Sequence, residues 1–373
     1  MTRAYLDHAS STPLRPAAAE AMAPWLGVPG DPGRVHAEGR AARFALEEAR
    51  EQVAAFLGAR PREVLFTSGG TEAVNTAVFG ATAAGPAHVV ASAVEHSAVL
   101  ESAQRAGTVT LIGVDGQGRV DPGAVAAGLR PETALVCVQA ANHEVGTLQP
   151  VAAVAEVCRA HGVRLHVDAC AAAGHVPVDF ASLGADLVSV SAHKLGGPRG
   201  VGALLIRRGV RLPPLLLGGA QERARRAGLE NVAAAVGFGA ACAELAAGAL
   251  EAEAKVARDL TDRVLAEAPA RVEGVSVFGD RDDRLPYLVC LGVDGVEAEP
   301  ILLALDQHGV AVHSGSSCSS ETFEPSPVLA AMGVDADHSL RVSVGWPSTG
   351  EDVDAFLAAF PAVVARLRAL RGG

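Results

Sequence analysis

Lysine is almost absent from this sequence. Its 31 lysine and arginine residues include only two lysines, Lys194 and Lys255. Arginine stays protonated in proteins, whereas a lysine amine in a partly desolvated pocket can lose its proton and form a Schiff base. Lys255 lies in an alanine-rich, charged stretch that is typical of a solvated helix face. Lys194 lies in a glycine-rich turn between two apolar runs, so it is the better candidate for covalent chemistry. The alternative is an ordinary lysine in a surface turn.

Clustered positive charge is also missing. The formal net charge is −11 and the isoelectric point is near 5.6, which argues against a nucleic-acid-binding surface because such a surface needs grouped cations. Asp7, His8 and Arg15 interrupt any secretion signal. The most apolar long segment, residues 232–250, contains Glu244 and is interpreted as a buried helix rather than a membrane span. We therefore expect a soluble, cytoplasmic protein with no direct contact to nucleic acid or membrane.

The six cysteines include no Cys-x-x-Cys pair, which argues against a disulfide or zinc framework, and no metal site is predicted. Cys318 is surrounded by serine and glycine, so we expect an exposed thiol on a mobile loop that can ionise. The alternative is an idle surface thiol. The other five lie in apolar or alanine-rich runs and are interpreted as inert packing residues: Cys137, Cys158, Cys170, Cys242 and Cys290.

Strand-like and helix-like runs alternate over most of the chain, which predicts an α/β fold. The strand candidates are continuously apolar, as in a mostly parallel sheet that helices cover on both faces. Near Ala257 the alternation stops, and the remainder predicts a smaller α+β domain. We expect a large domain over residues 15–256 and a small domain formed by residues 1–14 and 257–373. The predicted strands of the large domain are residues 63–67, 88–92, 133–138, 163–167, 186–190 and 201–206.

Polar or titratable residues follow the ends of several predicted strands. In open α/β sheets, ligands bind beyond the carboxyl ends of the strands, so we expect these residues to meet at one edge. They are Thr71, Glu95 and His96, the run 142–144, Asp168, and Ser191, His193 and Lys194. Gly69, Gly70 and Thr71 also lie between a strand and a helix, where free backbone amides and the helix dipole can bind a phosphate. Alone, this glycine turn is weak evidence.

A phosphate site, an aspartate and a lysine at neighbouring strand ends are what pyridoxal phosphate requires. The lysine forms a Schiff base with the cofactor, and the carboxylate keeps the pyridine nitrogen protonated. Lys194 and Asp168 suit these roles, and Ser191 and His193 would add donors to the phosphate. Two structural alternatives stay open at this point: Asp168 can simply cap a turn, and His96 can be a hydrogen-bonded structural histidine.

With these residues placed, the sequence resembles the pyridoxal-phosphate enzymes of aminotransferase class V, specifically the NifS/IscS-like cysteine desulfurases. The serine-rich loop around Cys318, followed by Glu324, Pro325 and Ser326, is similar to the long-loop branch that feeds iron–sulfur assembly and tRNA thiolation. The resemblance implies fold type I of these enzymes. It is carried by residues 5–9, 66–72, 95–100, 142–146, 166–169, 191–194, 218–223, 314–318 and 341–345.

The resemblance also implies roles. Lys194 holds the cofactor and takes the α-proton of L-cysteine, and His96 stacks on the cofactor ring and shuttles protons. Arg341 and Asn142 bind the substrate, with Arg341 pairing its carboxylate. Cys318, as thiolate, attacks the substrate sulfur, which leaves a persulfide and releases alanine. The expected partners are a second copy of the chain and a sulfur acceptor such as an iron–sulfur scaffold or a tRNA-thiolation protein.

Three positions depart from the family pattern: His143 replaces an asparagine, Ala171 replaces a glutamine, and Ala227-Gly228-Leu229 replaces Ser-Gly-Thr. We hypothesise that His143 supplies the hydrogen-bond donor that Ala171 lacks. These departures keep two other functions open: another class V lyase, transaminase or epimerase, and a non-catalytic sulfur-assembly partner. Selenocysteine is a further candidate substrate.

Overall fold

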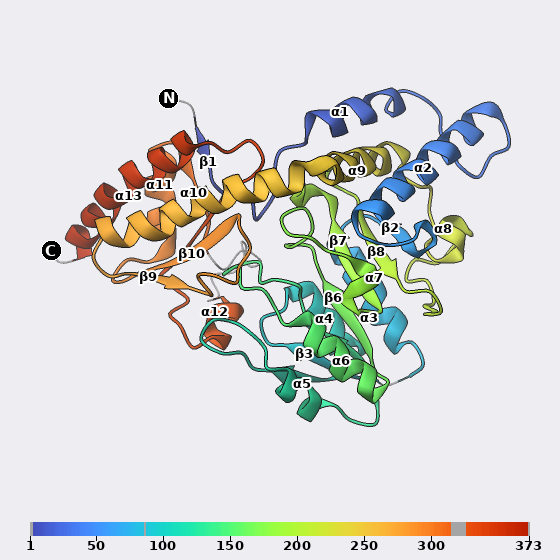
Figure 1. Cartoon of the computed structure of the whole chain (residues 1–373), viewed down its shortest axis with the longest axis horizontal. Helices are drawn as coiled ribbons and strands as arrows, with labels where there is room; N and C mark the ends of the chain where they lie inside the picture. Colours follow the sequence, from blue (N-terminus) through green and yellow to red (C-terminus); the bar gives the residue numbers. More distant parts are fainter. Residues whose placement is uncertain (1–2, 86, 315–325, 372–373) are drawn as a thin grey trace.

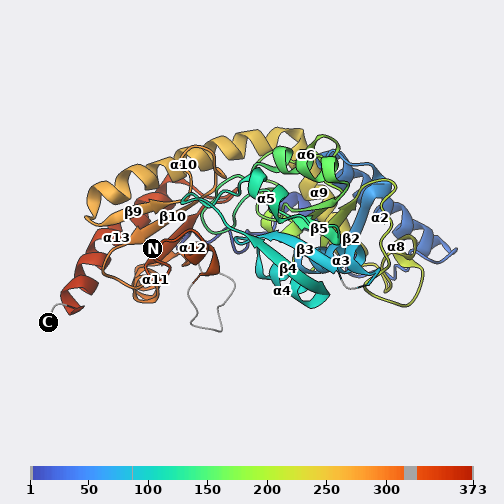
Figure 2. The ribbon, with the colours of Figure 1, turned by 90° about the horizontal axis from the view of Figure 1, so that it is seen from below.

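The computed structural model describes residues 3–85, 87–314 and 326–371. A large α/β part and a smaller part lie side by side, joined by a long helix (Figures 1 and 2). The large part contains a seven-stranded sheet in the order β2-β8-β7-β6-β5-β3-β4. Neighbouring strands are parallel except at β8, which is antiparallel to β2 and β7. The strands are β2 (Val64–Thr67), β3 (Ala87–Ser92), β4 (Gly107–Ile112), β5 (Thr133–Cys137), β6 (Arg164–Asp168), β7 (Leu187–Ser191) and β8 (Gly202–Ile206).

Helices cover both faces of this sheet, as the continuously apolar strands predict. Buried residues of α2, α5, α6, α7 and α9 pack on one face, and those of α3 and α4 pack on the other. Strand β4 is not among the predicted strands, because this edge strand is largely exposed and reads Gly-Thr-Val-Thr at its start. The helices of the large part are α1 (Pro16–Met22), α2 (Ala37–Phe56), α3 (Gly70–Thr82), α4 (Ser97–Ala106), α5 (Pro122–Gly128), α6 (Val151–His161), α7 (Phe180–Leu183), α8 (Gln221–Ala224) and α9 (Val232–Glu244).

One long helix connects the two parts. Helix α9 continues through a π-helical stretch (Leu245–Ala249) into α10 (Leu250–Arg271). The 40 residues Val232–Arg271 are long and apolar enough to cross a membrane, but half of their most apolar window is buried inside the protein. Core helices of soluble proteins pass the same test, so this is weak evidence for a membrane segment. The domain boundary that we expect after residue 256 falls within α10 and stays a prediction.

The smaller part is built on an antiparallel sheet of β9 (Val275–Phe278), β10 (Leu288–Val293) and β12 (Ser339–Ser343), in the order β12-β10-β9. Buried residues of α10, α11 (Ala298–Gln307) and α13 (Gly350–Arg371) form its core. Helix α12 (Pro327–Ala331) follows residue 326. The N-terminal arm joins this part, because β1 (Ala4–Tyr5) pairs with β11 (Val310–Ala311) and Leu6 is buried in the same core.

Candidate active site

A cavity of about 270 Å³ opens where β2, β3, β5, β6 and β7 end. The parallel strands bring their carboxyl ends to one edge, so the residues that follow them meet there, as the sequence predicts. The cavity brings together most of the predicted site residues, from both parts of the protein: Gly70, Thr71, His96, His143, Asp168, Ser191, His193, Lys194 and Arg341.

Lys194 ends a short 3-10 helix (Ala192–Lys194) directly after β7. Its backbone carbonyl accepts a hydrogen bond from Nε2 of His175 at 3.0 Å. The next residue is held as well, because Nε of the buried Arg15 donates to the Leu195 carbonyl at 2.9 Å. Gly196 has a φ of +87°, and a Cβ there would lie 2.6 Å from Cγ of Arg15. The turn therefore fixes the lysine backbone while its side chain lines the cavity.

The β2–α3 turn forms one end of the cavity. Helix α3 begins at Gly70, and among the described residues no side chain caps this end, so its amides and positive dipole face the cavity. Gly70 is required here, since a Cβ would lie 2.5 Å from Sγ of Cys170. The Ser191 hydroxyl lies 2.8 Å from Nδ1 of His193. Burial, and then the charge of Lys194, lowers the pKa of His193 to about 4, so this histidine is a neutral donor at neutral pH.

Asp168 ends β6 and is buried, with Oδ1 accepting a hydrogen bond from the Cys170 amide at 2.9 Å. One expectation is corrected here: Cys170 lines the cavity and is not a core residue. Burial and the neighbouring Asp168 carboxylate raise the pKa of the Cys170 thiol well above its usual value, so the thiol stays protonated. The other packing cysteines, Cys137, Cys158, Cys242 and Cys290, are buried as predicted.

His96 and His143 lie on one wall of the cavity, with ring centroids 5.4 Å apart in an edge-to-face arrangement. His96 is the N-cap of α4, and its Nδ1 accepts a hydrogen bond from the Ala98 amide at 3.0 Å. The proton of the neutral ring is therefore on Nε2. Burial, followed by the neighbouring His96 and the charges of Lys194 and Arg341, holds the pKa of His143 well below its ordinary value.

Arg341 reaches the cavity from β12 of the smaller part and is 1% exposed. Its Nη1 donates to the His143 carbonyl at 3.0 Å, and its Nη2 donates to Oδ1 of Asp7 at 3.1 Å. Asp7 is not predicted from the sequence as a partner of this arginine. The only signal for Asp7 is that it lies in the N-terminal motif 5–9. A buried guanidinium held in this way can pair with a carboxylate in the cavity.

Among the described residues, one predicted site residue, Asn142, does not line the cavity. Asn142 is fully buried in the turn of residues 142–145. Its Oδ1 accepts hydrogen bonds from the amides of Glu144 and Val145, and its Nδ2 donates to the Val94 carbonyl. The structure therefore gives Asn142 a place in the turn and no place on the cavity wall. Cys318 lies outside the described residues.

Glu95, three residues after β3, is a buried acid whose environment the sequence did not reveal. Its Oε1 accepts a hydrogen bond from the Gln139 amide at 2.6 Å. Burial, and then the charge of Asp168, raises the pKa of Glu95 to about 8, so the group is mostly protonated at neutral pH. Ser10 and Gln139 also line the cavity and were not predicted.

Comparison with known proteins identifies the family. The model of the aminotransferase class-V family matches residues 4–356. The chain belongs to this family. It is 41% identical to the cysteine desulfurase IscS of Dictyoglomus turgidum, covering 98% of this chain and 95% of the relative. It is 43% identical to an IscS-like cysteine desulfurase of Mycobacterium tuberculosis, covering 98% and 97%.

Solved structures agree with this class V membership. A NifS-like protein superposes with a TM-score of 0.91 at 31% identity, covering 98% of this chain and all of the other. A NifS-like protein from Rickettsia africae gives a TM-score of 0.90 at 29% identity, covering 97% of this chain and 99% of the other. The predicted fold of a large domain with a mostly parallel sheet and a smaller α+β domain is confirmed.

Members of this family depend on pyridoxal phosphate, and the cavity suits that cofactor. It has an uncapped helix N-terminus for a phosphate, a buried carboxylate for the pyridine nitrogen, and a lysine amine for the aldehyde. Gly70, where a side chain would close the approach to the helix, provides the room. Leu229, which stands where the family pattern has threonine, is exposed. Arg226, nearby in the sequence, forms an ion pair with Glu72.

Proposed function

We propose that this protein is a pyridoxal-phosphate-dependent cysteine desulfurase, which converts L-cysteine to L-alanine and transfers the sulfur to Cys318. The observation that carries the proposal is the meeting of Lys194, Asp168 and Arg341 in one cavity, in a chain whose full length is similar to cysteine desulfurases.

Asp168, Lys194 and the N-terminus of α3, with Thr71, Ser191 and His193 beside it, would hold the cofactor. When bound, the cofactor ring withdraws electrons and so stabilises negative charge at the substrate α-carbon. Asp168 is buried beside this cavity, where its carboxylate would keep the pyridine nitrogen protonated. His193 is neutral, so it can donate a hydrogen bond to the phosphate without adding charge.

The remaining cavity residues orient the substrate and move protons. Arg341, whose guanidinium is already held by Asp7 and the His143 carbonyl, would pair with the substrate carboxylate. The Lys194 amine would remove the α-proton as general base and return a proton to the product. His96 presents Nε2–H to the cavity, where it would donate to the substrate sulfur.

The sulfur transfer balances without an external oxidant. The bond between Cβ and sulfur of L-cysteine breaks, a bond between that sulfur and the Cys318 sulfur forms, and Cβ gains a proton to give alanine. The Cys318 thiol loses its proton before attack, because the thiolate is the nucleophile. The enzyme is left with a persulfide, which a second protein must accept.

The finer assignments belong to the proposal. We infer a sulfur acceptor of the iron–sulfur scaffold or tRNA-thiolation type, because the chain is similar to proteins named IscS. A homodimer is inferred from the resemblance. A cytoplasmic location is inferred from the interrupted secretion signal, and selenocysteine stays a candidate second substrate.

The test is mass spectrometry of Cys318 after the holoenzyme is incubated with L-cysteine, together with an assay for alanine. We expect the addition of one sulfur atom at Cys318 and release of alanine. Cys318→Ala should abolish the transfer, and Lys194→Ala should reduce alanine release by at least about 10³-fold. Lys255→Ala, which changes the other lysine, is the matched control. Release of another product, or an unmodified Cys318, would refute the proposal and favour a different class V activity.

A further inference from the structure

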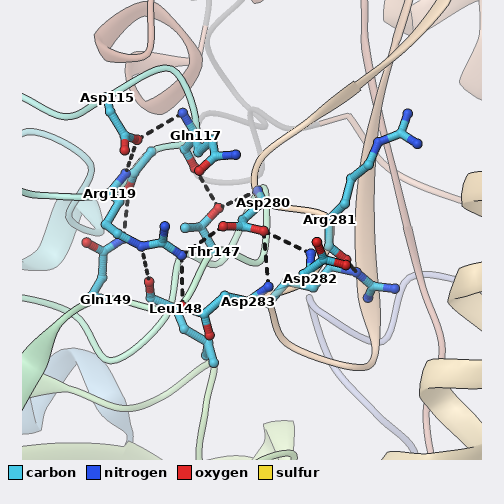
Figure 3. A network of polar contacts seen from close by, with 12 residues as sticks. Asp115, Gln117, Arg119, Thr147, Leu148, Gln149, Asp280, Arg281, Asp282 and Asp283 are labelled. Carbon is cyan, nitrogen blue, oxygen red and sulfur yellow. Dashed lines mark hydrogen bonds and ion pairs between the residues drawn. The ribbon is translucent and has the colours of Figure 1, made fainter.

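Outside the cavity, Arg119 ties the two parts of the protein together. Its Nη2 donates to Oδ2 of Asp280 and to Oδ2 of Asp283, both at 2.9 Å, and its Nε donates to the Leu148 carbonyl at 3.3 Å (Figure 3). Arg119 and Leu148 belong to the large part, whereas the two aspartates lie in the loop between β9 and β10 of the smaller part. These four residues are called the Arg119 clasp below.

Hydrogen bonds of the Thr147 hydroxyl and the Leu148 amide add to the clasp. The Thr147 hydroxyl donates to the Gln117 carbonyl at 2.6 Å and accepts from the Asp280 amide at 3.0 Å. The Leu148 amide donates to the Asp283 carbonyl at 3.1 Å. Thr147 is fully buried. The short segment 147–148 is therefore held between the 117–119 turn and the loop of the smaller part, as Figure 3 shows.

The same segment supports the active site at its other end. Ala141 and Leu148 form an antiparallel bridge that closes the hairpin 141–148, and the Thr147 carbonyl accepts from the Asn142 amide at 2.9 Å. His143, near the tip of this hairpin, lines the cavity and accepts a hydrogen bond from Arg341 through its carbonyl. The hairpin thus connects the clasp to the cation that faces the substrate.

We propose that Arg119 is a positioning residue. It holds the hairpin 141–148 and the smaller part in a fixed relative position, and this position determines the affinity of Arg341 for the substrate carboxylate. The inference rests on the proposed function. Lys194 lies in the large part and Arg341 in the smaller one, so the distance between them depends on the relative position of the two parts. Because a bidentate contact tolerates little displacement, a small shift of Arg341 weakens the contact. Arg119 itself touches no reacting atom.

The clasp needs a guanidinium. Its planar fork supplies donors to three acceptors at once, which a lysine ammonium cannot match in the same geometry. Without that cation, Asp280 and Asp283 would face each other as two uncompensated carboxylates. Backbone hydrogen bonds from Asp282 and Asp283, together with Arg119, hold the pKa of Asp280 below its usual value. The Asp280 carboxylate therefore stays ionised at neutral pH.

The experiment uses the Arg119→Met holoenzyme. Steady-state alanine release from L-cysteine gives KM and kcat, and the change in cofactor absorbance on titration gives the dissociation constants of L-alanine and of 2-aminoethanethiol, which lacks a carboxylate. We expect KM and the L-alanine constant to rise by at least about fivefold, with kcat within about twofold. Binding of 2-aminoethanethiol should not change.

Arg263→Met is the control, because Arg263 also contacts two carboxylates, those of Glu267 and Asp354, but lies entirely in helices of the smaller part. It should leave all four constants unchanged. If Arg119→Met fails to fold, Arg119→Lys, which keeps the charge and loses the fork, should raise the same two constants. Unchanged L-alanine binding, or equal weakening of 2-aminoethanethiol, would overturn the inference. A wild-type enzyme that releases no alanine would instead refute the proposed function, and the L-alanine titration would still test the clasp.

Discussion

Arg341 and His143 are joined by a hydrogen bond of 3.0 Å from Nη1 to the backbone carbonyl. This bond connects β12 of the smaller part with the hairpin 141–148 of the large part. Arg341 and the cavity wall at His143 are therefore expected to move together, although almost 200 residues separate them in the chain.

The first prediction concerns the fork of Arg341. In Arg341→Lys, the charge remains but the bidentate geometry is lost, together with the contacts to Asp7 and to the His143 carbonyl. Loss of a charged hydrogen bond of this kind should raise KM for L-cysteine by about 10- to 100-fold. Steady-state kinetics of alanine release measures it, with Arg263→Lys as control. An unchanged KM would show that Arg341 does not bind the substrate carboxylate.

His143 gives the second prediction. As a buried neutral imidazole in the cavity wall, it can donate one hydrogen bond toward the cofactor. His143→Ala should change the absorbance of the bound cofactor and its dependence on pH, whereas His143→Asn, which keeps a donor, should behave more like the wild type. A pH titration followed by absorbance distinguishes them. If the alanine variant matches the wild type, the donor hypothesis is wrong.

The third prediction concerns stability far from the site. Glu222 and Arg50 form a buried bidentate ion pair at 2.6 and 2.8 Å, and the Phe66 amide also donates to Glu222. Since Glu222→Gln removes the buried carboxylate and leaves the Arg50 charge with only the partly exposed Glu47, at 3.3 Å, it should lower the free energy of unfolding by about 3–5 kcal/mol. In contrast, Glu297→Gln breaks the exposed pair with Arg371 and should cost at most about 1 kcal/mol. Denaturant unfolding compares the two, and equal losses would contradict the prediction.

Glu95 leads to a prediction about pH. Its pKa is raised from its ordinary value of 4.5 to about 8 in the folded protein, so the folded state binds more protons than the unfolded state between these values. Stability contributed by this group is therefore greatest at low pH and falls as pH rises from about 4.5 to about 8. In Glu95→Gln this fall should disappear. The melting temperature of both proteins between pH 5 and 9 tests it, and curves of the same shape would refute it.

The residues that follow the parallel strands could be predicted to meet at one edge, because the topology of the sheet alone brings them together. Thr71, Asp168 and Lys194 belong to this group, and they line one cavity as predicted. The role of Arg341 came only from resemblance, since its position depends on how the smaller part packs against the large one. No local pattern encodes that packing.

Two expectations differ from the observed geometry for local reasons. Cys170 was interpreted as a packing residue because alanines surround it, but the turn after Asp168 directs its thiol to the cavity beside Gly70. Asn142 was expected at the substrate, yet its carboxamide is used by backbone groups of its own turn. Short polar side chains often satisfy the nearest backbone first, and sequence alone does not reveal when they do.

The N-terminal arm has a consequence for synthesis of the protein. Leu6 exchanges backbone hydrogen bonds with Ala311 and Ser343, and the Arg15 amide donates to the carbonyl of Gly196, so residues 4–15 connect strands of the smaller part with the lysine turn. Leu6 and these two strand partners are more than 300 positions apart in the sequence, so the arm is translated long before the strands that it pairs with. Until those strands have been made, the backbone groups of the arm can bond only to water or to other segments.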